Sequence, residues 1–316
     1  MKRMFQDRLR WFDPAPTTPS ATTSKMKKTV FSIATLLAMT CAGGSAHASN
    51  PLLGIIEGEN WDLPVVPSAS VFIQSGMIQQ NQRYYDAAGY TTRNPTGGTS
   101  VIGLTRFVHI WSFKSMPSVG FLIEVFQPEE SLPIGHGNTV SGLGDPFVHM
   151  LVYKNFFNNS LTLGVGNILS IPVGSNEVSS HAWLNAPNIV ADYKVGKWGV
   201  DGTVAVGFLS KVSSGCTPQY GCAEPGDIYT GNVSVRYEVT PWFVPFVGYA
   251  VQTEDRGQFT NDASLQVPGN RENDVGAGAR FKMGRLRWFS IWYYRSMGGS
   301  NTTKTNAIYL KFATPL

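Results

Sequence analysis

Apolar and polar side chains alternate over a series of short segments in this sequence. Successive side chains of a β-strand point to opposite faces of a sheet, so each such segment predicts a strand with one apolar and one polar face. Repeated around a closed sheet behind a secretory leader, the pattern is typical of an outer-membrane β-barrel. The clearest example is residues 228–239, with the odd positions Tyr229, Gly231, Val233, Val235, Tyr237 and Val239 against the even positions Ile228, Thr230, Asn232, Ser234, Arg236 and Glu238.

Residues 26–48 have the features of a secretory leader. Lys27 and Lys28 form a basic start, a short apolar run follows, and Ala46-His47-Ala48 supplies a cleavage site with small residues. The alternative is a transmembrane helix, but the apolar run falls short of the about 20 residues that a spanning helix needs. We therefore predict export and cleavage near Ala48.

The leader divides the chain into four parts. We predict a non-native or misassigned extension over 1–25, a signal peptide over 26–48, a periplasmic segment or plug over 49–69, and the barrel over 70–316. The first two parts hold seven Lys or Arg and two Asp or Glu. The mature chain is therefore left with a net charge of about −1, and the basic pI indicates no nucleic-acid partner.

Twelve segments have the length of about 9 to 11 residues that a tilted strand needs to cross a bilayer. Short connections at 113–117, 155–160, 196–197, 240–241 and 284–285 alternate with long ones at 82–99, 129–142, 173–185, 211–226, 253–271 and 298–304. This alternation predicts periplasmic turns, extracellular loops and two termini on the periplasmic side. The strands are expected at 70–81, 100–111, 118–128, 143–154, 161–172, 186–195, 198–210, 227–239, 242–252, 272–283, 286–297 and 305–313.

Ionisable residues indicate which face of each strand meets lipid. A cation at mid-membrane depth costs roughly 2 to 4 kcal/mol on the lipid face, so Arg280 is expected to point into the lumen. Residues 100–111 and 286–297 have apolar side chains on both faces and do not settle their orientation. The same argument gives our predicted pore lining, which is Glu124, His149, Asp192, Asp201, Asn232, Arg236, Arg280 and Lys282.

Aromatic residues gather near the predicted strand ends. Tyr and Trp favour the boundary between headgroups and water, so we interpret these residues as membrane anchors. Trp288, Trp292 and Tyr294 are the exception, because one of the two possible registers of residues 286–297 would direct them toward the lumen. The expected anchors are Trp111, Phe113, Phe156, Phe157, Trp198, Trp242, Phe243 and Trp288.

Acidic residues cluster in the predicted loops. They could gather divalent cations or form a solvated extracellular rim, and nothing in their spacing fixes a coordination number, so we predict no metal site. They are Glu129, Glu130, Glu254, Asp255, Glu272 and Asp274.

Cys216 and Cys222 lie six positions apart in a segment rich in Gly, Ser and Pro. Exported proteins meet an oxidising compartment, which favours a small disulfide ring. A zinc site is the alternative, but two thiols without a nearby His make a poor one.

No catalytic motif is evident, and we predict neither an enzyme nor a cofactor. A lipase needs Ser, His and an orienting Asn or Asp within hydrogen-bond reach. His136 and His181 lie in predicted loops. His149 follows Asp145 by four positions and could form a polar pair with it in the pore. Asp145 before Pro146 is also an ordinary loop-to-strand boundary, and we prefer that interpretation.

Two short motifs carry a resemblance to a known family. Gly142-Leu143-Gly144-Asp145-Pro146 follows a long loop, and Ile171-Pro172-Val173-Gly174 ends a later strand. With its length and strand count, the mature chain resembles the MetA-type outer-membrane transporter family associated with the meta-pathway of phenol degradation. This resemblance implies a barrel linked to the uptake of aromatic or other hydrophobic compounds.

We therefore predict a monomeric, all-β, antiparallel up-and-down barrel of twelve strands in the outer membrane of a Gram-negative bacterium. Its predicted function is passive uptake of small hydrophobic or aromatic solutes. Its predicted partners are outer-membrane lipid, lipopolysaccharide and the barrel insertion machinery, although the terminal Pro315-Leu316 departs from the aromatic ending common in barrels. A structural or adhesive barrel with a plugged lumen, an outer-membrane lipid hydrolase and a soluble β-sandwich are the alternatives.

Overall fold

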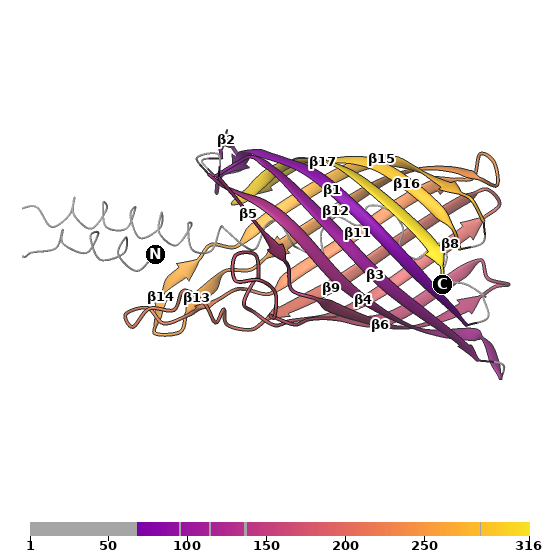
Figure 1. Cartoon of the computed structure of the whole chain (residues 1–316), viewed down its shortest axis with the longest axis horizontal. Helices are drawn as coiled ribbons and strands as arrows, with labels where there is room; N and C mark the ends of the chain where they lie inside the picture. The colour runs from indigo at the N-terminus through magenta and orange to yellow at the C-terminus, as the bar shows by residue number, and fades with distance from the viewer. Residues whose placement is uncertain (1–67, 95, 114, 136–137, 285) are drawn as a thin grey trace, which may run out of the picture. The chain divides into compact units, whose positions relative to one another are not determined.

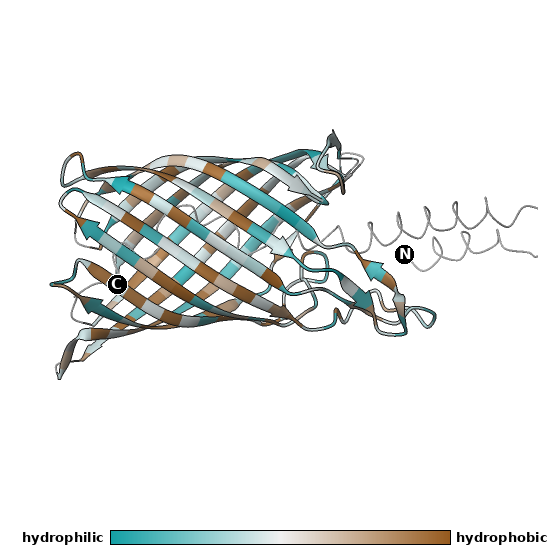
Figure 2. Ribbon diagram, turned by 180° about the vertical axis from the view of Figure 1, so that it is seen from behind, coloured by the Kyte–Doolittle hydropathy of each residue, from teal (hydrophilic) through white to brown (hydrophobic). Residues whose placement is uncertain are grey.

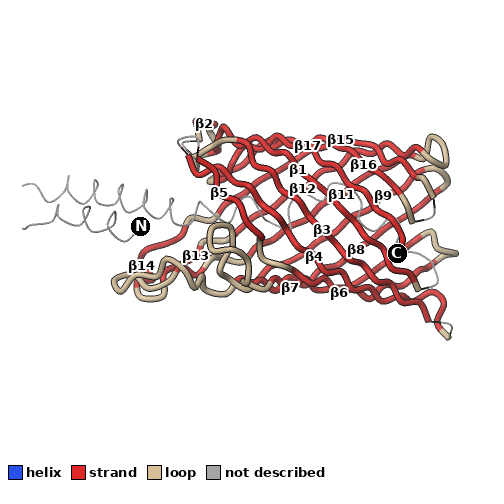
Figure 3. Tube along the Cα trace, viewed as in Figure 1, coloured by secondary structure: helices blue, strands red, loops and turns tan. Residues whose placement is uncertain are grey.

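The structure is a computed structural model that describes residues 68–316, apart from residues 95, 114, 136–137 and 285. All regular secondary structure in this part of the chain is β-strand (Figure 3). None of the described residues belong to a helix long and apolar enough to cross a membrane. The predicted extension, the leader and nearly all of the predicted periplasmic segment 49–69 lie outside the described residues.

Seventeen strands run through the described residues. They are β1 (Ala69–Tyr85), β2 (Thr91–Arg93), β3 (Thr99–Phe113), β4 (Met116–Gly135), β5 (Asn138–Leu143), β6 (Phe147–Phe156), β7 (Leu161–Ser170), β8 (Leu184–Val195), β9 (Trp198–Leu209), β10 (Ala223–Glu224), β11 (Ile228–Tyr237), β12 (Phe243–Glu254), β13 (Gly257–Phe259), β14 (Asp262–Val267), β15 (Asn270–Lys282), β16 (Trp288–Ser300) and β17 (Thr302–Pro315).

The strands close into a barrel (Figure 1). Each wall strand pairs antiparallel with its neighbours, and the last strand, β17, pairs with the first, β1. Two short strands, β2 and β5, extend the rim of the main sheet, and β10, β13 and β14 form a separate small sheet. The wall of the described barrel therefore has twelve strands, which confirms the predicted fold and strand number.

Each wall strand has one buried face and one exposed face. In β8, Asn188, Val190 and Asp192 are buried, whereas Ile189 and Tyr193 on the alternate positions are exposed. Figure 2 shows the resulting alternation of hydrophobic and hydrophilic residues along the strands. Because the sheet is closed, the buried face lines the interior and the exposed apolar face forms the outer wall.

One end of the barrel carries tight turns. Phe157, Asn158 and Asn159 adopt positive φ angles in the turn between β6 and β7, and Gly196 does so between β8 and β9. Both ends of the described barrel chain also lie here, because Val71 of β1 pairs with Pro315 of β17. The alternation of turn lengths thus places the described termini at the same end of the barrel.

The opposite end carries longer connections, but several predicted loops are wrong in detail. Residues 298–304 were expected to form a long loop, whereas Asn301 alone joins β16 to β17 and adopts a φ of 50°. Residues 129–142 are mostly strand, because β4 continues past the wall and returns as β5. The strand expected at 143–154 begins only at Phe147. Hairpins that extend beyond a membrane keep pairing their backbones in water, and sequence periodicity does not mark where the wall ends.

Exposed aromatic residues form two belts on the outer wall. Phe113, Phe157, Trp198 and Trp242 are exposed near the short-turn end, as expected of membrane anchors. Trp288 had been assigned both to this set and to the lumen-directed residues; its side chain is buried at the same end of β16, so its assignment as an anchor was wrong.

The second belt comprises the exposed Tyr229, Tyr249 and Tyr293, which lie nearer to the long-loop end than the first belt does. The eight residue steps from Tyr229 to Tyr237 of β11 span about 26 Å along the strand, or about 20 Å across a membrane at a tilt of about 40°.

Candidate functional site

The inner face of the barrel holds fully buried ionisable side chains from the spanning strands. Arg106, Arg280 and Lys311 are each 1% exposed, and Asp192 and Asp201 are similarly buried. Alternation along each strand places all five on the face opposite to the exposed apolar residues. The interior of the wall is therefore polar and charged, whereas its exterior is apolar.

Strands β8, β9 and β11 bring together an ionic cluster toward the short-turn end. A nitrogen of the Arg236 guanidinium lies 2.7 Å from Asp192 Oδ1, and Lys194 Nζ lies 3.3 Å from Asp192 Oδ2. The register also places Asp201 directly opposite Asp192 on one side and opposite Ser234 on the other. Three residues of the predicted lining, Asp192, Asp201 and Arg236, thus meet in one cluster.

A second predicted pair lies on β4 and β6. Glu124 and His149 are opposite each other in the ladder, and His149 Nδ1 lies 3.0 Å from Glu124 Oε2. The other ring nitrogen, Nε2, lies 3.4 Å from the side-chain amide of Asn188 on β8. The imidazole is thus held between a carboxylate and an amide on the inner wall, and it does not contact Asp145 as a polar pore pair would.

Cations occupy a different sector of the wall. Arg280 of β15 lies opposite Ser290 of β16, which lies opposite Lys311 of β17, which in turn lies opposite Ser75 of β1. The Arg280 guanidinium also stands 4.8 Å from the centre of the Trp288 ring. A guanidinium over an aromatic face is a favourable contact that holds both groups in place.

An aromatic cluster adjoins this cationic row. The rings of Trp292 and Tyr309 are stacked with centroids 4.0 Å apart, and Phe246 meets Trp292 edge to face. A Cβ atom on Gly278 would overlap the Trp292 side chain, so glycine is required at this position. Tyr309 donates its hydroxyl to Ser75 Oγ. The expectation that Trp292 points inward therefore matches its burial.

Two indole N–H groups on the inner wall lack a hydrogen-bond acceptor. Within the described part of the chain, Trp288 Nε1 and Trp292 Nε1 are buried without any hydrogen-bond partner. A buried donor without an acceptor costs free energy comparable to a lost hydrogen bond. An acceptor on a bound solute would satisfy either donor.

The remaining predicted lining residues lie apart from these clusters. Asn232 is half-buried opposite Thr203 and Ala250, in the middle of its strand. Lys282 lies at the short-turn end, where its Nζ is 3.8 Å from Glu238 Oε2. The structure therefore does not gather all eight predicted residues into one site.

Three of the acidic residues assigned to loops are instead buried inside the barrel, so their assignment to loops was wrong and a solvated rim does not apply to them. Glu130 belongs to β4, and Glu272 and Asp274 belong to β15. Ser296 and Thr302 both donate hydroxyl hydrogen bonds to the Glu272 carboxylate. The predicted loops extended too far at these points, so residues of the inner wall were assigned to loops. No group of three or more His, Cys, Asp or Glu among the described residues could hold a metal ion.

Sequence reasoning missed two of the buried cations. Lys311 alternates with the outward Leu310 and Phe312, so the cost of a cation against lipid could have placed it inside. The orientation of Arg106 could not be assigned from the sequence, because its strand carries apolar residues on both faces. Its guanidinium lies 5.0 Å from the centre of the Phe126 ring.

The two family-type motifs form one structure at the long-loop end. Asp145 accepts hydrogen bonds from the Gly174 N–H, from Ser179 Oγ, and from both the N–H and Oγ of Ser180. Pro146 O accepts the N–H of Ile171. A Cβ atom on Gly174 would overlap the backbone of residues 143–145, which requires glycine there. Asp145 therefore anchors the whole connection between β7 and β8, a larger role than the loop boundary we expected.

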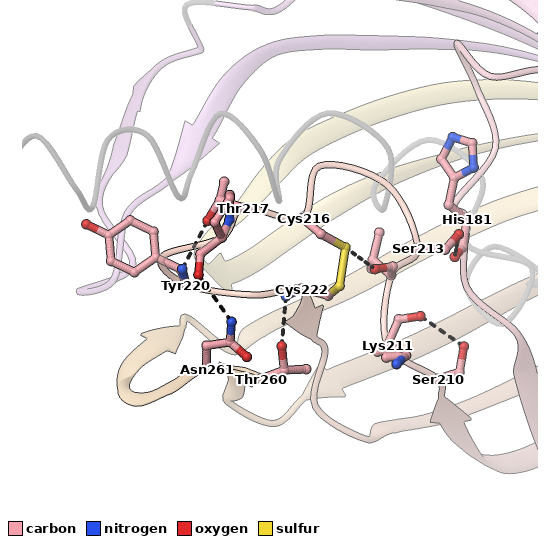
Figure 4. The surroundings of a disulfide bond; sticks show 12 residues. His181, Ser210, Lys211, Ser213, Cys216, Thr217, Tyr220, Cys222, Thr260 and Asn261 are labelled. Carbon is pink, nitrogen blue, oxygen red and sulfur yellow. Dashed lines mark hydrogen bonds between the residues drawn. A yellow bond between two sulfur atoms is a disulfide. The ribbon is translucent and has the colours of Figure 1, made fainter.

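The predicted disulfide between Cys216 and Cys222 is present in the structure (Figure 4). Its ring contacts the turn between β13 and β14: Thr260 Oγ1 accepts the N–H of Cys222, and Cys222 O accepts the N–H of Thr260. On the other side, Ser213 donates its N–H and Oγ to His181 O. The connection that contains the disulfide ring thus joins two neighbouring loops.

One Ser and His pair invites comparison with hydrolases. Ser70 Oγ lies 2.7 Å from His109 Nδ1 on the side of β3 that faces away from the interior. Among the described residues, no carboxylate or amide side chain is hydrogen-bonded to His109. The third member of a catalytic triad is therefore missing from this pair.

Comparisons with known proteins agree with this architecture. An outer membrane channel from Pseudomonas putida F1 superimposes with a TM-score of 0.73 over 83% of this chain and 100% of its own, at 15% sequence identity. The NanC porin matches with a TM-score of 0.45 at 8% identity, over 78% of this chain and 99% of its own. The P. putida toluene transporter TodX matches with a TM-score of 0.44 at 7% identity, over 79% and 91% respectively.

The channel at a TM-score of 0.73 shows that the chain has the fold of an outer-membrane barrel. No curated protein sequence matches the chain significantly. The family described as "Putative MetA-pathway of phenol degradation" matches residues 81–312. Because this match covers most of the sequence, including both short motifs and the whole barrel except most of β1 and the last residues of β17, the chain belongs to that family.

Proposed function

We propose that this protein is a passive channel of the outer membrane for small hydrophobic or aromatic compounds. The observation that carries the proposal is the contrast between the two faces of the closed wall. The outer face is apolar with two aromatic belts, whereas the inner face is charged, hydrogen-bonding and aromatic. A closed sheet has no unpaired edge in lipid and provides an interior separated from it.

Aromatic solutes fit the inner wall better than sugars do. The cluster of Phe246, Trp292 and Tyr309 offers ring faces, and the indole N–H of Trp292 offers a donor for a hydroxyl or carboxylate oxygen. The family's association with phenol degradation supports the same class of solute. We propose that the predicted lining residues, from Glu124 to Lys282, set selectivity among such solutes.

The proposal includes the route to the membrane. Export follows from the leader with cleavage near Ala48 in a Gram-negative bacterium, and the insertion machinery would recognise the final strand. In β17, Ile308, Leu310 and Phe312 form the exposed apolar row, so Phe312 supplies the terminal aromatic residue of the outer wall. The long-loop end would then face outward, against lipopolysaccharide.

Reconstitution into liposomes tests the function. We expect vesicles with the purified mature chain to take up phenol and benzoate faster than empty vesicles, and to take up arabinose and sucrose more slowly than the aromatic solutes. Flux is measured by liposome swelling or by stopped-flow dilution. Uptake of all solutes at the rate of empty vesicles would contradict the proposal.

The structural alternative requires a plugged lumen. Deleting residues 49–67 separates the two functions, because a plugged channel gains flux when that segment is removed. Absence of flux both before and after the deletion would instead support a structural or adhesive barrel. A lipase assay on the same detergent-extracted protein addresses the enzyme alternative.

A further inference from the structure

Cations are concentrated on one part of the rim at the long-loop end. In the ladder, Arg83 of β1 lies directly opposite Lys304 of β17 and also opposite Arg93 of β2. Like charges directly opposite each other in a sheet are destabilising. Three cations in one row therefore favour an external counter-anion that neutralises them.

A fourth cation, Arg295, extends this row on the outer wall. It follows the exposed Tyr293 by two positions on β16, and the register places it opposite Asn306, which is two positions from Lys304. Alternation along both strands therefore puts Arg295 and Lys304 on the outer face. We call Arg83, Arg93, Arg295 and Lys304 the basic row.

Carboxylates nearby do not neutralise the basic row. No described residue forms a salt bridge with any of its four members. The Asp86 carboxylate accepts the backbone N–H groups of Ala88 and Tyr90. Glu272 and Asp274 face the interior of the barrel and are buried.

The basic row lies just beyond the aromatic belt. Tyr293 donates its hydroxyl to Asn306, and Tyr249 donates its own to Asn273, so these two tyrosines place their hydroxyls toward the long-loop rim. Tyrosine hydroxyls of this kind mark the level of the headgroups. The cations are therefore at the depth where lipid phosphates lie.

The opposite side of the barrel lacks such a row. Strands β7 and β9 contain no Lys or Arg, and Lys194 of β8 lies at the short-turn end on the inner face. At the long-loop end, β7 and β8 instead carry Asn167 and Asn185, hydrogen-bonded to each other. The outward cations at the long-loop end thus lie on β1, β2, β16 and β17 and on the adjacent β15, where Arg271 is exposed, and not on the opposite side of the barrel.

We propose that the basic row binds the phosphates of lipid A, the lipid anchor of lipopolysaccharide, on the outer wall. Arginine is suited to this task because its planar guanidinium donates two parallel hydrogen bonds to a phosphate. The apolar outer faces of β16 and β17 below the row, which include Ile291, Ile308 and Leu310, would contact the acyl chains. The proposal rests on the outer-membrane location given above, but not on transport.

A binding measurement in detergent tests the site. The purified barrel is titrated with bis-phosphorylated lipid A and with dephosphorylated lipid A, in EDTA to remove bridging cations, and bound lipid is counted by native mass spectrometry. The test variant carries Arg83→Gln, Arg295→Gln and Lys304→Gln. The matched control carries Lys154→Gln, Lys197→Gln and Arg287→Gln, which remove the same charge at the short-turn end.

We expect the test variant to lose about a hundredfold in affinity for bis-phosphorylated lipid A. Each of the three cations near a lipid surface contributes about fivefold to the affinity, and the three factors multiply. The control should bind within about twofold of the unmodified protein. A further variant with Arg83→Lys and Arg295→Lys should retain most of the affinity because it keeps the charge.

Equal binding by the test variant and the unmodified protein would overturn the site. Equal binding of phosphorylated and dephosphorylated lipid A would also overturn it. The shift in gel mobility on heating verifies that each variant has folded. If the protein binds lipid A but shows no solute flux, the lipid A site is supported and the proposed channel function is contradicted.

Discussion

The cost of placing a charge against lipid determines where individual ionisable residues lie. Arg280, Lys311 and Arg106 point inward; both guanidinium groups lie over an aromatic ring, and Lys311 lies opposite Ser290 and Ser75 in the ladder. Because of the same cost, a charged side chain on the outer face indicates that this part of the wall lies outside the hydrocarbon layer. Where such side chains occur, at the rims, water or a headgroup solvates them.

Replacing Arg280 tests whether the cationic sector acts on permeating ions. Arg280→Gln keeps the polarity of the side chain and removes its positive charge, so we expect the ratio of chloride to potassium permeability to fall by about twofold. Reversal potentials in planar bilayers measure this ratio. Lys154→Gln, which changes a charge on the outer face, should leave it unchanged. An identical ratio for Arg280→Gln would show that this residue does not face the permeation path.

Replacing Asp145 tests the anchor of the connection between β7 and β8. In Asp145→Asn, the new amide nitrogen cannot accept the two hydrogen bonds from Ser180, which costs about 2 kcal/mol. This corresponds to about a thirtyfold rise in the population of the released loop. Cleavage after the exposed Glu177 by a glutamate-specific protease should accelerate accordingly.

The matched control is Asp86→Asn, which removes a similar loop-capping carboxylate from another connection. It should leave cleavage after Glu177 unchanged. Equal cleavage in the two variants would show that Asp145 does not hold the loop.

Residue-level prediction succeeded where a strand had a clear apolar row. Asp192 and Arg280 lie on the buried face because their neighbours along the strand are apolar. It failed for Arg106, whose strand is apolar on both faces, and for Glu272, which was assigned to a loop. The hydrogen bonds of Asp145 could not be predicted, because its partners lie 29 to 35 positions away in the sequence.

Elements beyond the wall are stabilised differently from the wall itself. The turn between β13 and β14 contains polar residues and depends on contacts with the disulfide ring. A disulfide that closes a ring of this size lowers the conformational entropy of the unfolded loop and so stabilises the folded loop by about 2 kcal/mol. We therefore expect the small sheet of β10, β13 and β14 to depend on this covalent bond.

Removing the disulfide should loosen this region alone. In the variant Cys216→Ser with Cys222→Ser, we expect faster tryptic cleavage after Arg256, while the gel mobility of the unheated barrel stays the same. The unmodified protein treated with a reducing agent should behave like the variant. If cleavage after Arg256 does not change, contacts other than the disulfide hold the hairpin.

The number and order of wall strands could be predicted because each strand alternates over the full membrane thickness. The positions where strands end could not. β4 and β5 continue pairing beyond the wall, and Asn301 makes a tight turn where a loop was expected. Backbone pairing in water needs no apolar row, so the sequence gives little indication of such extensions.

Closure of the sheet is the property on which the whole molecule depends. β17 pairs with both β16 and β1, and without it two strands would expose unpaired backbone groups to lipid. The pairing of Gln74 with Phe312 and of Ser75 with Lys311 shows that closure extends nearly to the end of the chain.

Truncation tests this dependence. A chain that ends at Asn301 lacks β17, so we expect it to show no heat-dependent shift in gel mobility and to be degraded in the periplasm. A chain that ends at Phe312 keeps most of the pairing and presents an aromatic terminus, so it should insert into the outer membrane. Fractionation of cells followed by immunoblotting measures both. Stable insertion of the shorter chain would contradict the need for closure by β17.

The contacts at the barrel mouth connect its surface mechanically. An antibody that binds the Cys216–Cys222 ring would exert force on the nearby Ser213, which is hydrogen-bonded to His181. His181 in turn is hydrogen-bonded to Ser179, and Ser179 to Asp145. A force applied to the ring is thus transmitted to the barrel wall along a short series of hydrogen bonds. A molecule that binds the ring would therefore also strain the connection between β7 and β8 that Asp145 anchors.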